Sequence, residues 1–338
     1  MKKDKFWKNK NVLITGVTGF VGSNLTKNLL ESGANIIGLT KSINAESLLF
    51  IENIDQKINL FSGDITNKEF VKNIFDKFDI EICFHLAAQA EVGLANNNPY
   101  STWETNVRGT YTLLEVIREN KSKIKSIIVA SSDKAYGKYP LSQLPYKENY
   151  KLNPEFPYDT SKACADMIAY SYSTKLFNLP VLITRFSNIY GPGQLNCTTL
   201  ITDAIRSCIL NKKLIMRSNG LAIRDFVYID DIVNLYKILS KNLYQNPKKF
   251  RGQIFNAGTN SKHKVKDILK KIFLYGKKID QFRKLEKAMK RKKTSGEINH
   301  QFMDYKKLNY YFGWRPKNSF EKNLPYLFKW YKSYFKRN

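Results

Sequence analysis

Cysteine, long apolar runs and acidic residues are all scarce in this 338-residue chain. Its four cysteines stand far apart and form no Cys-x-x-Cys pair, which excludes the usual spacing of a structural zinc site. Each lies in an apolar or helix-like context, where a buried thiol is the common occupant. We therefore expect a cytoplasmic protein with reduced thiols and without a bound metal.

No apolar run approaches the roughly 18 residues that a membrane-spanning helix requires. The basic N-terminal stretch reaches an apolar run of only four residues, 12–15, which is too short for the core of a signal peptide. We expect no membrane span. Peripheral contact between a basic flank and an anionic membrane is compatible with the sequence.

The shortage of acidic residues gives the chain a formal charge of +27, from 56 Lys and Arg against 29 Asp and Glu. Residues 241–338 carry +21 of this charge and residues 1–240 only +6. General lysine enrichment is the favoured interpretation, and attraction of a pyrophosphate or an anionic membrane is the second. Nucleic-acid binding by the basic run 283–293 is not expected. We interpret the aromatic residues nearby as lobe core: Tyr310, Tyr311, Phe312 and Trp314.

Short β-branched runs alternate with amphipathic segments, which predicts an α/β fold: a Rossmann-type doubly wound parallel sheet with a smaller C-terminal lobe. The expected strands are 12–15, 35–40, 58–61, 81–87, 126–131 and 180–186, followed by 225–230 and 253–258. The expected helices are 20–32, 67–77, 100–119, 158–178 and 231–243. We place residues 1–186 and 225–260 in the sheet domain, and residues 187–224 and 261–338 in the lobe.

A glycine-rich turn follows the first expected strand, with Gly16, Gly19 and Gly22 in the order Thr-Gly-x-x-Gly-x-x-Gly. Glycine allows a tight turn and a close approach of the backbone to a pyrophosphate. The helix that follows contributes free N–H groups and the positive end of its dipole. Because the turn lies between a strand and a helix, the pattern favours a dinucleotide site.

The type of dinucleotide depends on the end of the second strand, where an acidic residue normally holds the ribose hydroxyls of NAD. Thr40, Lys41 and Ser42 stand there instead. A cation and two hydroxyls suit a 2′-phosphate, which slightly favours NADP, although a solvated surface lysine explains Lys41 equally well. Asp64, after the third strand, is a candidate acceptor for the adenine amino group or a cap for the next helix.

A tyrosine and a lysine stand four residues apart at the start of an expected helix, as Tyr158 and Lys162. Residues with this spacing share a helix face, so we expect the ammonium to lower the phenol pKa toward working pH. The phenolate is then a base for a hydroxyl proton while a hydride leaves the carbon. Ser131 and Ser132 end the fifth strand, at the edge where open α/β sheets bind ligands.

Together these motifs resemble the extended short-chain dehydrogenase/reductases that act on nucleotide sugars. The resemblance covers roughly residues 10–260 and includes His85-Leu-Ala-Ala-Gln89, Asn106-Val-Arg-Gly-Thr110, Arg185-Phe-Ser-Asn188 and Arg224-Asp-Phe-Val-Tyr. It implies a catalytic trio of Ser132, Tyr158 and Lys162. The implied NAD(P) site comprises Gly16, Thr18, Gly19, Phe20, Val21, Gly22, Thr40, Lys41, Ser42, Asp64, Ile65, Leu86, Ala87, Ala88, Gln89, Asn106, Tyr158 and Lys162. The implied substrate site, for a nucleotide-diphosphate sugar, comprises Gln89, Ser132, Asn188, Asn196 and Arg224.

The branch of the family depends on Asp133 and Lys134, which follow Ser132. A 4,6-dehydratase oxidises C4, removes the C5 proton and expels the C6 hydroxyl, so it needs an acid and a base beyond the tyrosine. The Asp-Lys pair resembles CDP-glucose 4,6-dehydratases and the inverting UDP-N-acetylglucosamine dehydratases. Phe6-Trp7-Lys8 before the first strand also resembles the CDP-glucose group, which implies a tightly held, recycled NAD. A nucleotide-sugar 4-epimerase is the alternative within the same fold. A non-enzymatic nucleotide- or RNA-binding protein is the alternative from another class. By the same resemblance we expect a homodimer through the helices 100–119 and 158–178.

Overall fold

The computed structural model describes residues 5–120, 123–216, 218–292 and 298–337. The chain forms two compact units. The first unit comprises residues 1–137, 148–186 and 233–256, and the second comprises residues 138–147, 187–232 and 257–338. This division differs from the sequence-based boundaries mainly at 138–147 and 225–232, which belong to the second unit.

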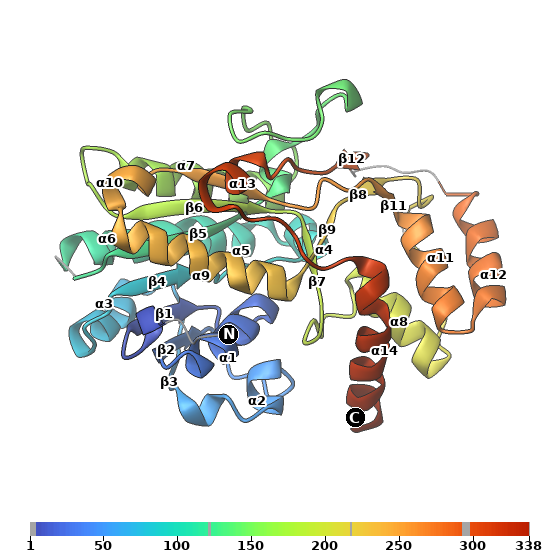
Figure 1. Cartoon of the computed structure of the whole chain (residues 1–338), viewed down its shortest axis with the longest axis horizontal. Coiled ribbons are helices and arrows are strands. Elements are labelled where there is room, and N and C mark those ends of the chain that lie inside the picture. The colour runs from blue at the N-terminus through green and yellow to red at the C-terminus, as the bar shows by residue number, and fades with distance from the viewer. Residues whose placement is uncertain (1–4, 121–122, 217, 293–297, 338) are drawn as a thin grey trace. The chain divides into compact units, whose positions relative to one another are not determined.

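The first unit is built on a seven-stranded sheet, drawn in Figure 1. Its strands are β1 (Asn11–Thr15), β2 (Asn35–Thr40), β3 (Asn59–Ser62), β4 (Ile82–His85), β5 (Ser126–Ser132), β6 (Val181–Phe186) and β10 (Ile254–Ala257). Their order is β3-β2-β1-β4-β5-β6-β10, and β1 to β6 pair in parallel. This is the 3-2-1-4-5-6 order of a Rossmann-type sheet. The predicted fold class is therefore confirmed.

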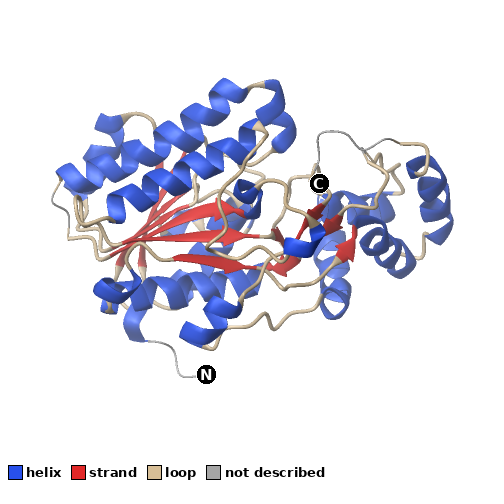
Figure 2. Cartoon of the chain, turned by 90° about the horizontal axis from the view of Figure 1, so that it is seen from above, coloured by secondary structure: helices blue, strands red, loops and turns tan. Residues whose placement is uncertain are grey.

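Helices cover both faces of this sheet (Figure 2). One face packs against α3 (Lys68–Lys77), α6 (Gly109–Glu119) and α7 (Pro157–Ser173), in an apolar cluster that includes Cys83. Because neighbouring residues of a strand point to opposite faces, Phe84 faces the other side. There its ring meets that of Tyr236, 5.6 Å away between centroids. Tyr236 belongs to α9 (Ile229–Gln245), and α1 (Phe20–Glu31) also covers a part of the sheet.

Shorter helices connect these elements: α2 (Leu48–Ile51), α4 (Val92–Asn97), α5 (Pro99–Trp103), a π-helical turn η3 (Glu104–Arg108), a 3-10 turn η4 (Asp133–Tyr136) and α10 (Pro247–Phe250). The expected single helix 100–119 is thus α5, η3 and α6 in succession. A π-helical turn inside a longer helix is rare and frequently occurs at functional sites. Asn106 belongs to this turn.

The second unit contains small sheets and a group of helices. Strand β7 (Asn188–Tyr190) pairs with β9 (Phe226–Tyr228), and β8 (Ile223–Arg224) lies between β11 (His263–Lys264) and β12 (His300–Gln301). The helices are α8 (Leu200–Leu210), α11 (Val265–Tyr275), α12 (Ile279–Met289), α13 (Lys306–Phe312) and α14 (Phe320–Arg337). Helix α8 packs against α11 and α14. The Tyr331 hydroxyl of α14 lies 3.0 Å from the Thr202 hydroxyl of α8 and donates to the Gln194 carbonyl.

Two expectations for this part of the chain need correction. The predicted strand 225–230 does not join the large sheet, because its residues pair with β7 instead. The aromatic run is only partly core, since Trp314 is 4% exposed but Tyr310 is 83% exposed. Of the basic run 283–293, most residues form α12, and residue 293 lies outside the described residues.

The helices of the described ranges include none with the length and apolar character needed to cross a bilayer. The four cysteines are free thiols, with Cys83 and Cys208 buried and Cys164 and Cys197 partly buried. Within the same ranges, no three His, Cys, Asp or Glu side chains are grouped so as to hold a metal ion.

Candidate active site

The glycine-rich turn after β1 is packed too tightly for side chains at two of its positions. Gly16 has a φ of +69°, and a Cβ added there would lie 2.9 Å from the Ala87 backbone. A Cβ on Gly22 would lie 2.3 Å from the Gly16 carbonyl oxygen. The Gly16 N–H donates to the Leu39 carbonyl at 2.8 Å, which fixes the turn beside β2. This close-packed backbone suits the approach of a dinucleotide pyrophosphate.

The first turn of α1 supplies positive potential at the same place. Its N-cap is Gly19, which has no side chain to satisfy the first N–H groups, and the first turn contains no acidic residue. Phe20 and Val21 begin the helix. The arrangement leaves the positive end of the helix dipole available to an anion, as NAD(P) binding requires.

The ends of β2 and β3 carry the residues expected to contact the cofactor ribose and adenine. The Thr18 and Thr40 hydroxyls are 2.8 Å apart, and Thr40 donates to the Ser42 carbonyl. Lys41 is 70% exposed and lies 3.1 Å from an Asp64 carboxylate oxygen. Burial raises the pKa of Asp64, but bonds from Thr66 and Lys41 outweigh it and hold that pKa below its usual value.

Asp64 does not cap the following helix, because the N-cap of α3 is Asn67, whose side chain accepts from the Phe70 N–H. The alternative role considered for Asp64 is therefore wrong. Its neighbour Ile65 is 4% exposed and contacts Gly109 at the start of α6.

The loop after β4, Leu86 to Gln89, is held by buried polar groups. The Thr15 hydroxyl accepts from the Leu86 and Ala87 N–H groups at 3.1 Å and lies 2.9 Å from His85 Nδ1. The other ring nitrogen of His85 lies 2.9 Å from the Thr110 hydroxyl. Burial, with a smaller effect of Lys162, lowers the pKa of His85 to about 3. The imidazole is thus neutral and serves to fix the loop.

Asn106 connects this loop to the helix that carries the tyrosine. Its side chain accepts from the Gln89 N–H at 2.7 Å and donates to the Gln89 carbonyl at 3.0 Å and to the Ser161 hydroxyl at 2.8 Å. Ser161 in turn donates to the Tyr158 carbonyl at 2.7 Å. Asn106 is 2% exposed, so its contacts in this structure position Gln89 and α7.

Ser132, Tyr158 and Lys162 come together where β5 ends and α7 begins. The Ser132 side chain forms a hydrogen bond with Tyr158, donates to Asp133 at 3.1 Å and accepts from the Lys134 N–H at 3.2 Å. Lys162 donates from Nζ to the Ala130 carbonyl at 2.9 Å. The spacing of the motif therefore brings all three predicted side chains to the carboxyl end of one strand.

The expected effect of Lys162 on Tyr158 is not found. Burial raises the pKa of Tyr158 well above its usual value, the Asp133 and Asp159 carboxylates add to this, and the Ser132 bond opposes it. The ammonium is engaged by the Ala130 carbonyl, and burial lowers the pKa of Lys162 to about 8. Desolvation outweighs the attraction between cation and phenolate that the spacing suggested.

Asp159 is a site residue that sequence reasoning missed. It is 2% exposed, and burial raises its pKa to about 6, while Lys134 lowers it and Asp133 and Glu155 raise it. Three charged side chains, Asp133, Lys134 and Asp159, therefore influence one another beside Tyr158. An acidic residue in a first helical turn usually faces solvent, so the sequence carried no signal for this burial.

A buried network fixes η4, the turn that carries Asp133 and Lys134. Arg185 of β6 forms two bonds with Asp166 of α7, at 2.8 and 2.9 Å, and donates to the Tyr136 hydroxyl at 2.8 Å. Tyr136 closes η4 and donates to Asn256 at 2.7 Å. The network joins β6 to the helix and the turn that carry Tyr158, Lys162, Asp133 and Lys134.

The remaining predicted substrate residues lie in the second unit. Asn188 donates to the Asp225 carbonyl at 3.2 Å, and Asn196 accepts from the Thr198 N–H at 2.8 Å. Arg224 donates to the Ile223 carbonyl at 2.9 Å. These contacts all lie within that unit.

Comparison with known proteins places this arrangement among nucleotide-sugar enzymes. The family described as GDP-mannose 4,6 dehydratase matches residues 13–325. A human dTDP-D-glucose 4,6-dehydratase is 30% identical over 96% of this chain and 91% of its own. A CDP-glucose 4,6-dehydratase from Salmonella typhimurium is also 30% identical, over 98% and 93%. The crystal structure of dTDP-glucose 4,6-dehydratase from Bacillus anthracis, in complex with NAD, superposes with a TM-score of 0.81 at 28% identity and covers 97% of this chain and 98% of that one.

Proposed function

Since the chain belongs to the GDP-mannose 4,6 dehydratase family of extended short-chain dehydrogenase/reductases, we propose that it converts CDP-glucose to CDP-4-keto-6-deoxyglucose and water. The observation that supports this is the pair Asp133 and Lys134 at the end of β5, beside Ser132 and Tyr158. Oxidation at C4 alone requires only the tyrosine, whereas elimination requires a further acid and base.

NAD(P), when bound, supplies the hydride acceptor for C4 and the hydride donor for C6. The glycine turn, whose backbone leaves no room for a Cβ at Gly16 or Gly22, fits its pyrophosphate. Lys41 would hold a 2′-phosphate only by leaving Asp64, with which it is paired at 3.1 Å. We therefore favour NAD over NADP, as the resemblance to CDP-glucose dehydratases also implies.

Three side chains transfer protons in the proposed reaction. Tyr158, in its deprotonated form, accepts the proton of the C4 hydroxyl while Ser132 holds that oxygen. Burial disfavours that form, so the raised pKa of Tyr158 opposes this step. Lys134 takes the proton from C5, which the new C4 ketone acidifies. Asp133 gives a proton to the C6 hydroxyl, the C6–O bond breaks and water leaves. Lys134 then returns its proton to C5 as C6 is reduced. The proton held by Tyr158 passes through solvent to Asp133, which restores both side chains, so the net change is the loss of one water.

The choice of CDP-glucose rests on Asp133 and Lys134 together with the resemblance of Phe6-Trp7-Lys8 to the CDP-glucose group, because the relatives that act on other nucleotides are as similar in overall sequence. We assign Asn188, Asn196 and Arg224 of the second unit to the nucleotide diphosphate. A cation and two side-chain amides suit phosphate and base oxygens.

A panel of nucleotide sugars tests the proposal. The purified protein is incubated with CDP-glucose, dTDP-glucose, GDP-mannose and UDP-N-acetylglucosamine, and the masses of the products are measured by mass spectrometry. We expect loss of water from CDP-glucose at the highest kcat/KM. A new sugar of unchanged mass would indicate the epimerase, and absence of turnover together with salt-sensitive RNA binding would indicate the non-enzymatic alternative.

We also propose a homodimer through α5, α6 and α7. These helices expose large apolar side chains, with Tyr100 71%, Trp103 45%, Tyr111 42%, Met167 63% and Tyr170 50% exposed. Apolar side chains gathered on neighbouring helices are typical of a protein interface, and paired helices from two copies form a four-helix contact.

A further inference from the structure

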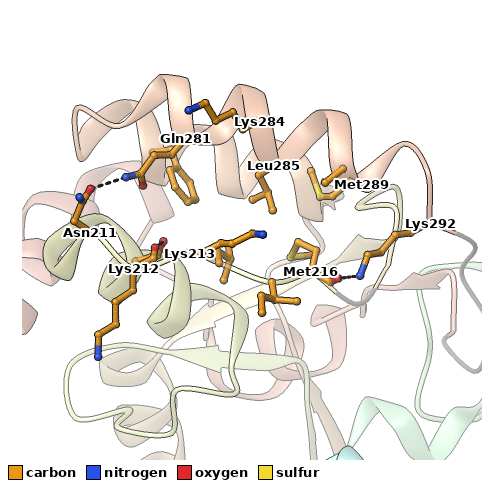
Figure 3. Close-up of a pocket in the computed structure, with 14 residues that line it drawn as sticks. Asn211, Lys212, Lys213, Met216, Gln281, Lys284, Leu285, Met289 and Lys292 are labelled. Carbon is orange, nitrogen blue, oxygen red and sulfur yellow. Dashed lines mark hydrogen bonds between the residues drawn. The ribbon is translucent and has the colours of Figure 1, made fainter.

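A groove in the second unit runs along α12, between this helix and the stretch that follows α8 (Figure 3). Its volume is about 550 Å³, within the range of sites for small molecules. Leu285 and Met289 of α12 form one wall, Leu214 and Met216 the other, and Phe273 of α11 also contributes. Neither the proposed catalytic residues nor the proposed substrate residues line it.

Two hydrogen bonds define the ends of the groove. At one end Gln281 donates to the Asn211 side chain at 2.6 Å, and at the other Lys292 donates from Nζ to the Met216 carbonyl at 2.5 Å. Residues 281 and 289 of α12 are eight residues apart along the helix, which corresponds to roughly 12 Å, and Lys292 follows the end of the helix. The groove is therefore elongated and suits a chain-like ligand better than a compact one.

The charged side chains that line the groove are all basic. Lys212, Lys213, Lys284 and Lys292 line it, and no carboxylate is found among the 14 lining residues of the described ranges. Figure 3 shows that the Lys213 side chain extends between the two walls below Leu285, whereas those of Lys212 and Lys284 point away from the groove. Apolar walls favour an apolar body, and ammonium groups without acidic partners in the lining favour an anion.

We propose that this groove binds an amphipathic anion, an acyl chain with a carboxylate or phosphate head. The chain lies along Leu285 and Met289, whose flexible thioether adapts to ligands of varied shape. The head lies between the ammonium groups of Lys213 and Lys292. A nucleotide sugar fits less well, because it is polar along most of its length and would leave the apolar walls exposed.

Calorimetric titration of the full chain with dodecanoate and dodecyl phosphate, below their micellar concentrations, tests the proposal. We expect one site per chain, with dodecanol and inorganic phosphate each bound at least about tenfold more weakly, because each supplies only half of the contacts. The tighter of the two anions identifies the head group. Absence of binding by both anions would overturn the proposal.

Substitutions in the groove locate the binding. Lys213→Glu and Leu285→Asp each place a negative charge among the walls, so we expect about tenfold weaker binding or more. Lys287→Glu is the matched control, since Lys287 is an exposed residue of α12 that does not line the groove. Equal loss in the control would indicate nonspecific attraction to the basic surface. Displacement of dodecanoate by CDP-glucose would assign the groove to the substrate site. Either result would contradict an independent site.

Discussion

Replacing Lys162 by Met is expected to stabilise the protein at neutral pH while it abolishes turnover. Lys162 is 8% exposed, and burial lowers the pKa of its ammonium from 10.5 to about 8, although Asp166 partly opposes this. At neutral pH the native state therefore contains a charged group that water would solvate better. At about 1.4 kcal/mol for each pH unit, this difference in pKa corresponds to roughly 3 kcal/mol of native-state destabilisation.

The sign of the pH dependence follows from where the proton is bound. The destabilisation is fully present below the native pKa of about 8 and disappears as the pH rises to 10.5. In this interval the unfolded chain still binds a proton that native Lys162 has released, so the free energy of unfolding of the wild type increases with pH. The Met variant lacks this increase. It also loses the bond from Nζ to the Ala130 carbonyl, which contributes about 1 kcal/mol.

We therefore expect Lys162→Met to be about 2 kcal/mol more stable than the wild type at neutral pH and about 1 kcal/mol less stable above the unfolded pKa. Urea unfolding at neutral and alkaline pH measures both differences. The matched control is Lys72→Met, which removes an exposed ammonium of α3 and leaves the buried site unchanged. If Lys162→Met is less stable than the wild type already at neutral pH, the buried ammonium does not destabilise the native state as we infer.

Three further substitutions test the mechanism and the assembly. Tyr158→Phe removes the proton acceptor and little volume, so oxidation at C4 should stop while the circular dichroism spectrum is kept; full activity would exclude Tyr158 from the mechanism. Lys134→Met should leave C4 oxidation possible but stop elimination, so that reduced nicotinamide accumulates and the C5 proton is retained in heavy water. An undiminished rate of 4-keto-6-deoxy product would remove Lys134 from the reaction and favour the epimerase. Met167→Asp places a charge on the exposed face of α7 and should halve the mass measured by light scattering at micromolar concentration; a wild type that is already monomeric would contradict the proposed dimer.

Much of the large sheet could be predicted because its signals are local. Strands β1, β2, β4, β5 and β6 are short, largely buried apolar runs between turn residues, and such a run is typical of a parallel strand covered on both faces. Strand β3, at the sheet edge, is more exposed. The strand predicted at 225–230 has the same local pattern. Its partner is β7, which is only three residues long, and such pairing depends on tertiary contacts that no local pattern encodes.

The sequence predicts where the candidate site lies, but it does not predict the pKa shifts of the side chains in it. Ser132 at the end of a strand and Tyr158 four residues before Lys162 suffice to place three side chains together. The direction of their pKa shifts depends on burial, which the spacing does not reveal. The same is true of Asp159 and Asp166, two acidic residues of α7 that the sequence alone would place at the surface.

The buried charges explain why η4 needs the network beneath it. Asp133, Asp159 and Lys162 are each at most 8% exposed, and each one removed from water destabilises the native state unless a partner compensates. Asp133 raises the pKa of Asp159, so the two carboxylates repel each other and would move apart if the backbone allowed it. Arg185 prevents this by joining Asp166 of α7 to Tyr136 of η4 through bonds of 2.8 to 2.9 Å. The ion pair is therefore better understood as holding charged groups close together for catalysis than as a source of stability, since a buried pair rarely stabilises a fold by itself.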